Sequence, residues 1–261
     1  MDDGLPKLTI MNLNLAEKVA LVTGSSRGIG KEIASALYEE NCRVVFNSTN
    51  PDCHDELIND FPGAIFLSGN ATKEGDAIKL VQETTKHFGQ LDILVCNVGS
   101  GRSSPPGEET SSDWKQMMDI NLYSAVNMVS AAKSALAESN GSIVCISSIC
   151  AHEVIPGAPI GYSTAKAALN AYIKSSSRSL AKLGIRINGV SPGNINFPGS
   201  VWDSKMQNDP NGVKNFLDDN VPLARLGTPA EVANLVTYLS SPKSDFVSGS
   251  IWTIDGGQIR S

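Results

Sequence analysis

The chain has 261 residues, of which 41% are hydrophobic and 18% charged, and its formal net charge is −6. This length suffices for one large α/β domain or two small ones, and the acidic balance disfavours nucleic acids and anionic membranes as partners. The apolar runs stay well short of the roughly 18 residues that a transmembrane helix needs. The acidic beginning, MDDGLPKLTI, does not read as a secretory signal, so we expect a cytoplasmic protein.

Short β-branched apolar runs alternate along the chain with longer segments of helical periodicity. The predicted strands are Lys18–Thr23, Arg43–Asn47, Ala64–Ser68, Leu91–Cys96, Ser142–Ser147, Arg186–Val190 and Ser250–Ile254. The predicted helices span residues 28–40, 73–87, 112–138, 161–183 and 228–240. Runs that are apolar throughout indicate strands with helices on both faces. The sequence therefore predicts an α/β fold with a doubly wound, seven-stranded parallel sheet.

Two segments interrupt this alternation. Residues 1–14 precede the first predicted strand and are expected to form a loosely held tail, which leaves residues 15–261 as a single domain. Residues 193–220 form a long connection rich in turn-forming residues. A connection of this length inside a compact domain is usually functional, and here we expect a lid over the substrate.

Cysteine and histidine usage argues against disulfides and metal sites. The five cysteines include no C-x-x-C pair, and the three histidines are scattered without metal-ligand spacing. We expect reduced, mostly buried thiols and no metal.

The stretch TGSSRGIG follows the first predicted strand and opens the first predicted helix. Its glycines permit a tight turn and let backbone N–H groups approach a pyrophosphate. Ordinary Gly/Ser turns share this composition, but the position between a strand and a helix favours a dinucleotide loop. The cofactor-binding residues expected here are Gly24, Ser26, Arg27, Gly28, Ile29 and Gly30.

Further motifs follow in the order CNVG (96–99), DINLYS with Asn121, ISS ending at Ser148, YSTAK beginning at Tyr162, and SPG (191–193). Together with TGSSRGIG, they resemble the short-chain dehydrogenase/reductase family over roughly residues 17–258. The resemblance implies a Rossmann fold and nicotinamide-dependent oxidation or reduction at a carbonyl or secondary alcohol. It also implies a homotetramer or homodimer.

The end of the second predicted strand bears on the choice of cofactor. An acidic residue there would bind the ribose 2′-hydroxyl of NAD and repel the 2′-phosphate of NADP. The chain has Asn47, Ser48 and Thr49 instead, and Arg27 in the glycine loop is suited to a phosphate. These residues favour NADP(H), although Arg27 could also be a solvated surface side chain. By resemblance, the remaining cofactor-binding residues are Asn70, Ala71, Asn97, Gly99, Tyr162, Lys166, Pro192, Gly193 and Ile195. Asn70 stands where the family usually has an Asp that contacts adenine, and its side-chain carbonyl can accept the same hydrogen bond.

Tyr162 and Lys166 are four residues apart in a predicted helix and therefore point the same way. A nearby ammonium favours the phenolate, so Lys166 would lower the pKa of Tyr162 and make it a usable acid and base. Ser148 closes a strand at the carboxyl end of the sheet and would bind the substrate oxygen, with Ser147 as the alternative. The resemblance adds that Lys166 holds the nicotinamide ribose and that Asn121 holds a water linking Lys166 to solvent.

Substrate contacts are expected from Ser148, Cys150, Tyr162, Phe197 and Trp202. The two lid aromatics could equally anchor the lid to the core. The leading function is an NADP(H)-dependent oxidoreductase that interconverts a ketone and a secondary alcohol of a small molecule. The alternatives are a catalytically silent dinucleotide sensor or scaffold, an NAD-dependent dehydrogenase, and another nicotinamide-dependent conversion such as epimerisation.

Overall fold

The computed structural model describes residues 11–260 and contains one seven-stranded parallel sheet, in the order β3-β2-β1-β4-β5-β6-β7. The strands are β1 (Val19–Val22), β2 (Arg43–Ser48), β3 (Ile65–Ser68), β4 (Ile93–Cys96), β5 (Ser142–Ile146), β6 (Arg186–Pro192) and β7 (Ile251–Ile254). The strand order reverses between β1 and β4, where doubly wound sheets bind their ligands beyond the carboxyl ends of the strands. The predicted doubly wound Rossmann fold is confirmed.

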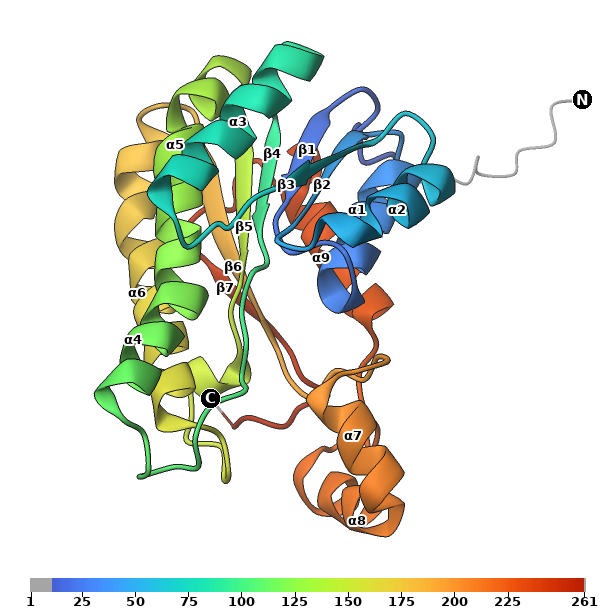
Figure 1. Cartoon of the computed structure of the whole chain (residues 1–261), viewed down its shortest axis with the longest axis vertical. Coiled ribbons are helices and arrows are strands. Elements are labelled where there is room, and N and C mark those ends of the chain that lie inside the picture. Colours follow the sequence, from blue (N-terminus) through green and yellow to red (C-terminus); the bar gives the residue numbers. More distant parts are fainter. Residues whose placement is uncertain (1–10, 261) are drawn as a thin grey trace, which may run out of the picture.

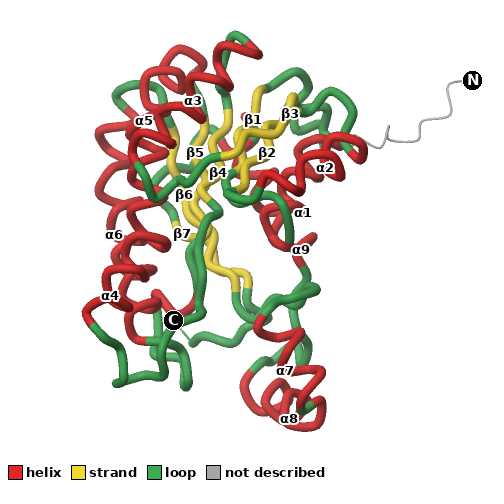
Figure 2. Tube along the Cα trace, viewed as in Figure 1, coloured by secondary structure: helices red, strands yellow, loops and turns green. Residues whose placement is uncertain are grey.

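Helices cover both faces of this sheet (Figures 1 and 2). One face carries α1 (Gly28–Glu39), α2 (His54–Asp60) and α9 (Pro229–Ser240), and the other carries α3 (Glu74–Phe88), α5 (Ser124–Ser139) and α6 (Ile160–Ala181). Helix α4 (Ser111–Met118) packs on α6. Helices α7 (Val201–Asn208) and α8 (Pro210–Asn220) form a hairpin that stands apart from the layered body in Figure 1.

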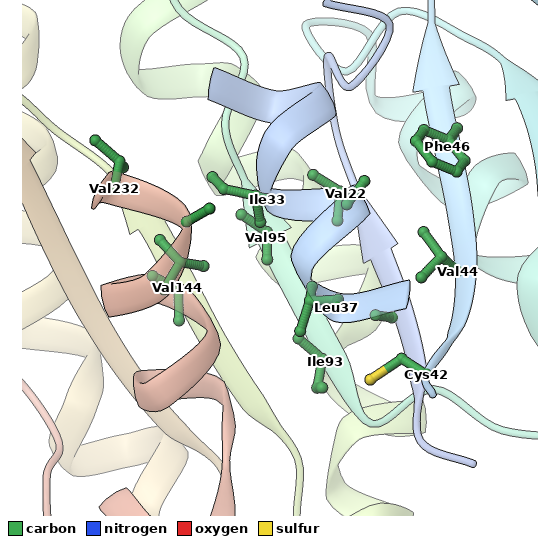
Figure 3. Packing of buried hydrophobic residues seen from close by; sticks show 14 of the residues in the cluster. Val22, Ile33, Leu37, Cys42, Val44, Phe46, Ile93, Val95, Val144 and Val232 are labelled. Carbon is green, nitrogen blue, oxygen red and sulfur yellow. The ribbon is translucent and has the colours of Figure 1, made fainter. Parts of the chain in front are cut away.

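Two hydrophobic clusters, one on each face of the sheet, explain why the strands are apolar throughout. Within β1, Ala20 and Val22 pack with α1 and α9, as Figure 3 shows for Val22. Val19 and Leu21 face the opposite cluster with α3, α5 and α6. Successive side chains of a strand point to opposite faces. Each residue of β1 therefore has an apolar neighbourhood whichever way it points.

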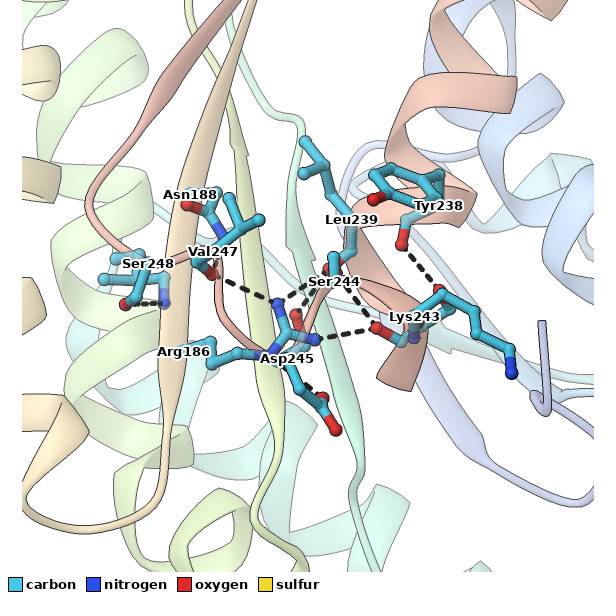
Figure 4. Close-up of polar contacts among 12 residues, drawn as sticks. Arg186, Asn188, Tyr238, Leu239, Lys243, Ser244, Asp245, Val247 and Ser248 are labelled. Carbon is cyan, nitrogen blue, oxygen red and sulfur yellow. Dashed lines mark hydrogen bonds and ion pairs between the residues drawn. The ribbon is translucent and has the colours of Figure 1, made fainter.

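At the amino end of β6, the Arg186 side chain fastens the chain between α9 and β7 to the sheet (Figure 4). Its guanidinium donates to the carbonyls of Leu239 (3.0 Å) and Ser241 (3.1 Å) and pairs with Asp245 at 3.5 Å. Burial lowers the pKa of Arg186. Because these contacts lie at the end of β6 opposite Pro192, they are structural and leave the carboxyl end of the sheet to the site.

Three features differ from the sequence prediction or go beyond it. The helix predicted over 112–138 is not continuous, because a π-helical turn, Asp119–Tyr123, separates α4 from α5. Helix α2 was not predicted, since HDELIND is short and polar. The expected connection 193–220 contains α7 and α8.

The expected tail, residues 1–14, falls mostly outside the described residues. Between residues 11 and 260, no helix is both long and apolar enough to cross a membrane.

Candidate active site

The loop between β1 and α1 presents backbone N–H groups at the first turn of α1. Gly24 and Gly28 have φ angles of 61° and 58°, in the left-handed region that favours glycine. A Cβ on Gly30 would collide with the Gly24 carbonyl oxygen and the Asn97 amide. No side chain makes a capping hydrogen bond at the N-terminus of α1, so its first N–H groups are not satisfied by a side-chain acceptor. This local structure fits the pyrophosphate of a dinucleotide.

Two asparagine side chains hold the glycine loop in place. The Asn97 amide nitrogen donates to the carbonyls of Thr23 and Gly24, each at 3.0 Å. The Asn47 side-chain oxygen accepts from the Gly24 N–H at 3.2 Å, and its amide nitrogen donates to two carbonyls at the end of β3. Both amide hydrogens of Asn47 are therefore engaged within the protein. This residue shapes the loop and keeps no spare donor for a ligand.

The residues expected to select the cofactor lie together beside this loop. The hydroxyls of Ser26 and Ser48 are 3.3 Å apart, and Thr49 is exposed. Arg27 is exposed as well, and among residues 11–260 it has neither an ion-pair nor a hydrogen-bond partner for its guanidinium. An unpaired guanidinium next to two hydroxyls is suited to a phosphate group.

At the end of β3, Asn70 and Ala71 occupy the place expected for the adenine contact. The Asn70 side-chain oxygen accepts from the backbone N–H and the hydroxyl of Thr72, at 3.0 and 2.8 Å. Ala71 is buried. The carbonyl that was expected to bind adenine is thus engaged in a local turn, and the amide nitrogen of Asn70 is the polar group that remains.

Tyr162 and Lys166 share one face of α6, as their spacing predicts. The Lys166 side chain is only 3% exposed, and its ammonium nitrogen donates to the Ile146 carbonyl at 2.7 Å. It lies 5.9 Å from the centre of the Tyr162 ring. Burial raises the pKa of Tyr162 to about 12, and burial lowers the pKa of Lys166 to about 8. The lowering of the tyrosine pKa that was expected from Lys166 is not found for the protein's own groups, because burial is the largest effect on Tyr162.

The two adjacent serines that follow β5 have different hydrogen-bond partners. The Ser148 hydroxyl lowers the pKa of Tyr162 through a hydrogen bond, against the larger effect of burial, and accepts from the Cys150 N–H at 3.2 Å. The Ser147 hydroxyl instead donates to the Asn170 side-chain oxygen at 2.6 Å. Successive residues of an extended chain point to opposite sides, so Ser148 alone accompanies Tyr162.

The π-helical turn brings Asn121 against the loop that follows β4. Asn121 is 1% exposed; its side-chain oxygen accepts from Ser100 N–H at 2.9 Å and its nitrogen donates to the Ser100 carbonyl at 3.0 Å. A Cβ on Gly99 would lie 2.9 Å from the Lys166 ammonium and 3.0 Å from the Asn121 oxygen, so a bare backbone separates the two side chains. A Cβ on Gly101 would lie 3.9 Å from the Tyr162 ring. π-turns of this kind occur often at functional sites.

The SPG turn at the end of β6 closes the site on its other side. Gly193 donates its N–H to the Ile254 carbonyl at 2.9 Å, and a Cβ there would lie 2.8 Å from the Asp255 side chain. Pro192 ends β6, and the buried Ile195 bridges to Gly227 ahead of α9. These residues are held rigidly at the carboxyl end of the sheet.

The residues expected to contact the substrate lie in different parts of the structure. Cys150 is half-buried beside Ser148, and burial raises its thiol pKa. Phe197 lies against Gly28 of the glycine loop. Trp202 packs on Phe216 within the α7–α8 hairpin, with ring centres 5.2 Å apart. Of the two lid aromatics, Trp202 therefore anchors the lid internally and Phe197 faces the expected cofactor.

Several contacts of the site have no signal in the sequence. Asn170 links Ser147 to the ring nitrogen of His152, which lies 3.0 Å from the Ser191 hydroxyl. Arg102 donates to the Gly199 carbonyl at 3.0 Å and so joins the loop after β4 to the lid. Only the spacing of Asn170, one turn beyond Lys166, could have placed it on this helix face. Among residues 11–260 no group of three potential ligands of a metal is found.

Comparisons with known proteins agree with this geometry. The family model described as enoyl-(acyl carrier protein) reductase matches residues 24–258. L-fucose dehydrogenase of Bos taurus is 32% identical over 95% of this chain and 91% of its own. The structure of L-sorbose reductase from Gluconobacter frateurii, complexed with NADPH and L-sorbose, has a TM-score of 0.87 at 28% identity and covers 96% of this chain and 100% of that one. A 7α-hydroxysteroid dehydrogenase complexed with NADH and 7-oxo glycochenodeoxycholic acid has a TM-score of 0.86 at 27% identity, covering 96% and 97%.

The fold, the glycine loop and the Ser–Tyr–Lys group define a dinucleotide-binding oxidoreductase of the Rossmann class. The chain belongs to the short-chain dehydrogenase/reductase family, whose members among its relatives act on alcohol and carbonyl groups.

Proposed function

We propose that this protein is an NADP(H)-dependent oxidoreductase that interconverts a ketone and a secondary alcohol of a small molecule. The observation that carries the proposal is the meeting of Ser148, Tyr162 and Lys166 at the carboxyl end of the sheet, beside a loop that fits a pyrophosphate. A silent sensor would have no use for a buried ammonium held next to a tyrosine, so the enzymatic function is favoured.

The nicotinamide dinucleotide supplies or accepts the hydride when it is bound. The glycine loop and the exposed Arg27 would hold its phosphates, and Lys166 would hold the nicotinamide ribose. Tyr162, whose pKa of about 12 keeps its hydroxyl protonated at neutral pH, donates the proton to the carbonyl oxygen. Ser148 donates a hydrogen bond to the same oxygen and stabilises its developing charge.

The preference for NADP(H) rests on residues beside the glycine loop. The end of β2 carries Asn47, Ser48 and Thr49 in place of an acidic residue, so nothing there repels a 2′-phosphate. Arg27 lacks a carboxylate partner among the described residues and offers the phosphate a charge-assisted hydrogen bond.

Self-association is part of the proposal. Strand β7 is an edge strand of the sheet, and Trp252 on it is 36% exposed. An exposed edge that carries a large aromatic side chain favours pairing with a second copy. A homodimer or homotetramer would cover this edge.

The experiment that tests the function is a screen for NADPH oxidation with sugars that carry a keto group, oxo-steroids and 3-oxoacyl thioesters. NADH is the parallel cofactor and Tyr162→Phe is the control. Turnover of at least one carbonyl compound by the native protein and not by the variant supports the proposal. Turnover that the variant retains would contradict it.

A further inference from the structure

One side chain of the lid, Phe197, packs directly against the backbone of the glycine loop at Gly28. A Cβ built on Gly28 would lie 2.5, 2.8 and 2.9 Å from the Cε2, Cζ and Cδ2 atoms of Phe197. The aromatic ring therefore occupies the space that a side chain at position 28 would need. Phe197 is half-buried here and also packs against the hydrophobic cluster below α1 and α9.

That space has a specific use in dinucleotide-binding loops. The glycine nearest the start of the helix is bare so that a pyrophosphate can approach its backbone closely, and Gly28 is the first residue of α1. A phosphate group that approached this side of the Gly28 backbone would need the space that the ring occupies.

Phe197 belongs to a structured turn that we call the strap, residues 196–200. Ser200 accepts from the Phe197 N–H at 3.3 Å and from the Asp203 N–H at 2.9 Å, so the strap caps α7. Gly199 donates its N–H to Asp203 and receives a hydrogen bond from Arg102 across the site. A shift of the Phe197 backbone would therefore move the start of α7 as well.

We propose that Phe197 occupies the pyrophosphate position of the dinucleotide site, and that binding of the cofactor displaces this side chain. The inference rests on the proposed function only in requiring that a dinucleotide binds here. It reassigns Phe197 from substrate contact to competition with the cofactor. It is independent of the choice between NADP(H) and NAD(H), because both cofactors carry the same pyrophosphate.

The test compares dissociation constants for Phe197→Ala and the native protein with three probes: NADPH, NADH and adenosine 2′-monophosphate, which has no pyrophosphate. Removal of the ring should tighten NADPH and NADH binding alike, by roughly fivefold to twentyfold, the scale of a partly buried aromatic contact. Adenosine 2′-monophosphate should bind unchanged. Phe246→Ala removes the same side chain from a fully exposed position and should change none of the three constants.

Weaker or unchanged dinucleotide binding by Phe197→Ala would overturn the inference without affecting the proposed function. A gain seen with adenosine 2′-monophosphate as well would overturn it too, because the effect would then not concern the pyrophosphate. A second measurement does not depend on how well the alanine variant folds. In native protein labelled with 4-fluorophenylalanine, the fluorine signal of residue 197, assigned through Phe197→Tyr, should shift with either dinucleotide and stay in place with adenosine 2′-monophosphate. A signal unmoved by the dinucleotides would contradict displacement.

Discussion

The ammonium of Lys166 lies 5.9 Å from the centre of the Tyr162 ring and donates its hydrogen bond to the backbone carbonyl of Ile146. The protein thus buries a cation beside a phenol, and no carboxylate of residues 11–260 pairs with it. This arrangement is costly for the fold, since desolvation disfavours the charged form of a buried lysine. A site that retains such a cost is expected to use the charge.

The first prediction is that Lys166→Met stabilises the protein near pH 7 while abolishing its activity. The folded-state pKa of Lys166 is depressed from 10.5 to about 8. The unfolded chain therefore binds more protons between these values, and native stability should rise with pH across that window. The cost at pH 7 is on the order of 3 kcal/mol, reduced by the lost hydrogen bond to Ile146.

Urea unfolding of both proteins at pH 7 and pH 10 measures this difference. The stability advantage of Lys166→Met should shrink at the higher pH, because the native lysine is then largely neutral when folded. An advantage that is absent at pH 7, or that grows with pH, would show that Lys166 is not buried as a strained cation.

The second prediction concerns the two adjacent serines. Ser148→Ala should lower kcat by about 100-fold to 1000-fold, the effect of losing one donor to a developing oxyanion. Ser147→Ala removes the hydrogen bond to Asn170 and should cost about 1 kcal/mol of stability, with turnover changed only a few-fold. Steady-state kinetics and thermal unfolding of the two variants separate these effects. Equal losses of turnover would remove the distinction between the serines.

The third prediction concerns Arg27. Arg27→Ala should raise the KM for NADPH by about tenfold to 100-fold, the range of a charge-assisted hydrogen bond, and leave the KM for NADH unchanged. Arg178→Ala, at an exposed position near the end of α6, is the matched control for loss of a positive charge. A native enzyme that uses NADH more efficiently than NADPH would contradict the cofactor assignment.

The fourth prediction concerns the exposed edge of the sheet. Trp252→Arg should release monomers from a native dimer or tetramer, because a charged side chain on an edge strand opposes pairing. Light scattering coupled to size-exclusion chromatography gives the mass of each species. A native protein that is already monomeric at micromolar concentration would refute self-association.

The apolar patterning of each segment was sufficient to predict the fold, because it reflects which side chains are buried. The central strands were predictable because both of their faces are covered, as Val19 and Ala20 of β1 show by packing into opposite clusters. Spacing was also sufficient for Tyr162 and Lys166, which belong to one helix face. The π-turn at Asn121 was not predictable, since it depends on hydrogen bonds to Ser100 in a different segment.

The same limit applies to the strap. The contact between Gly28 and Phe197 joins segments 169 positions apart (197 − 28), and no periodicity or motif relates them. The sequence could assign Phe197 to the site region through its place in a long connection, but not to one ligand. Desolvation was missed in the same way: the pKa of Tyr162 depends on what covers it, which only the packed structure shows.

The central claim is that Tyr162 transfers the proton, and Tyr162→Phe tests it most directly. With the best carbonyl substrate of the screen at saturating NADPH, the variant should lose at least about 1000-fold in kcat. Its dissociation constant for NADPH should stay within about twofold of the native value, because the lost hydroxyl is not needed to bind the pyrophosphate. A variant that binds NADPH normally and reduces the carbonyl at a comparable rate would contradict the claim.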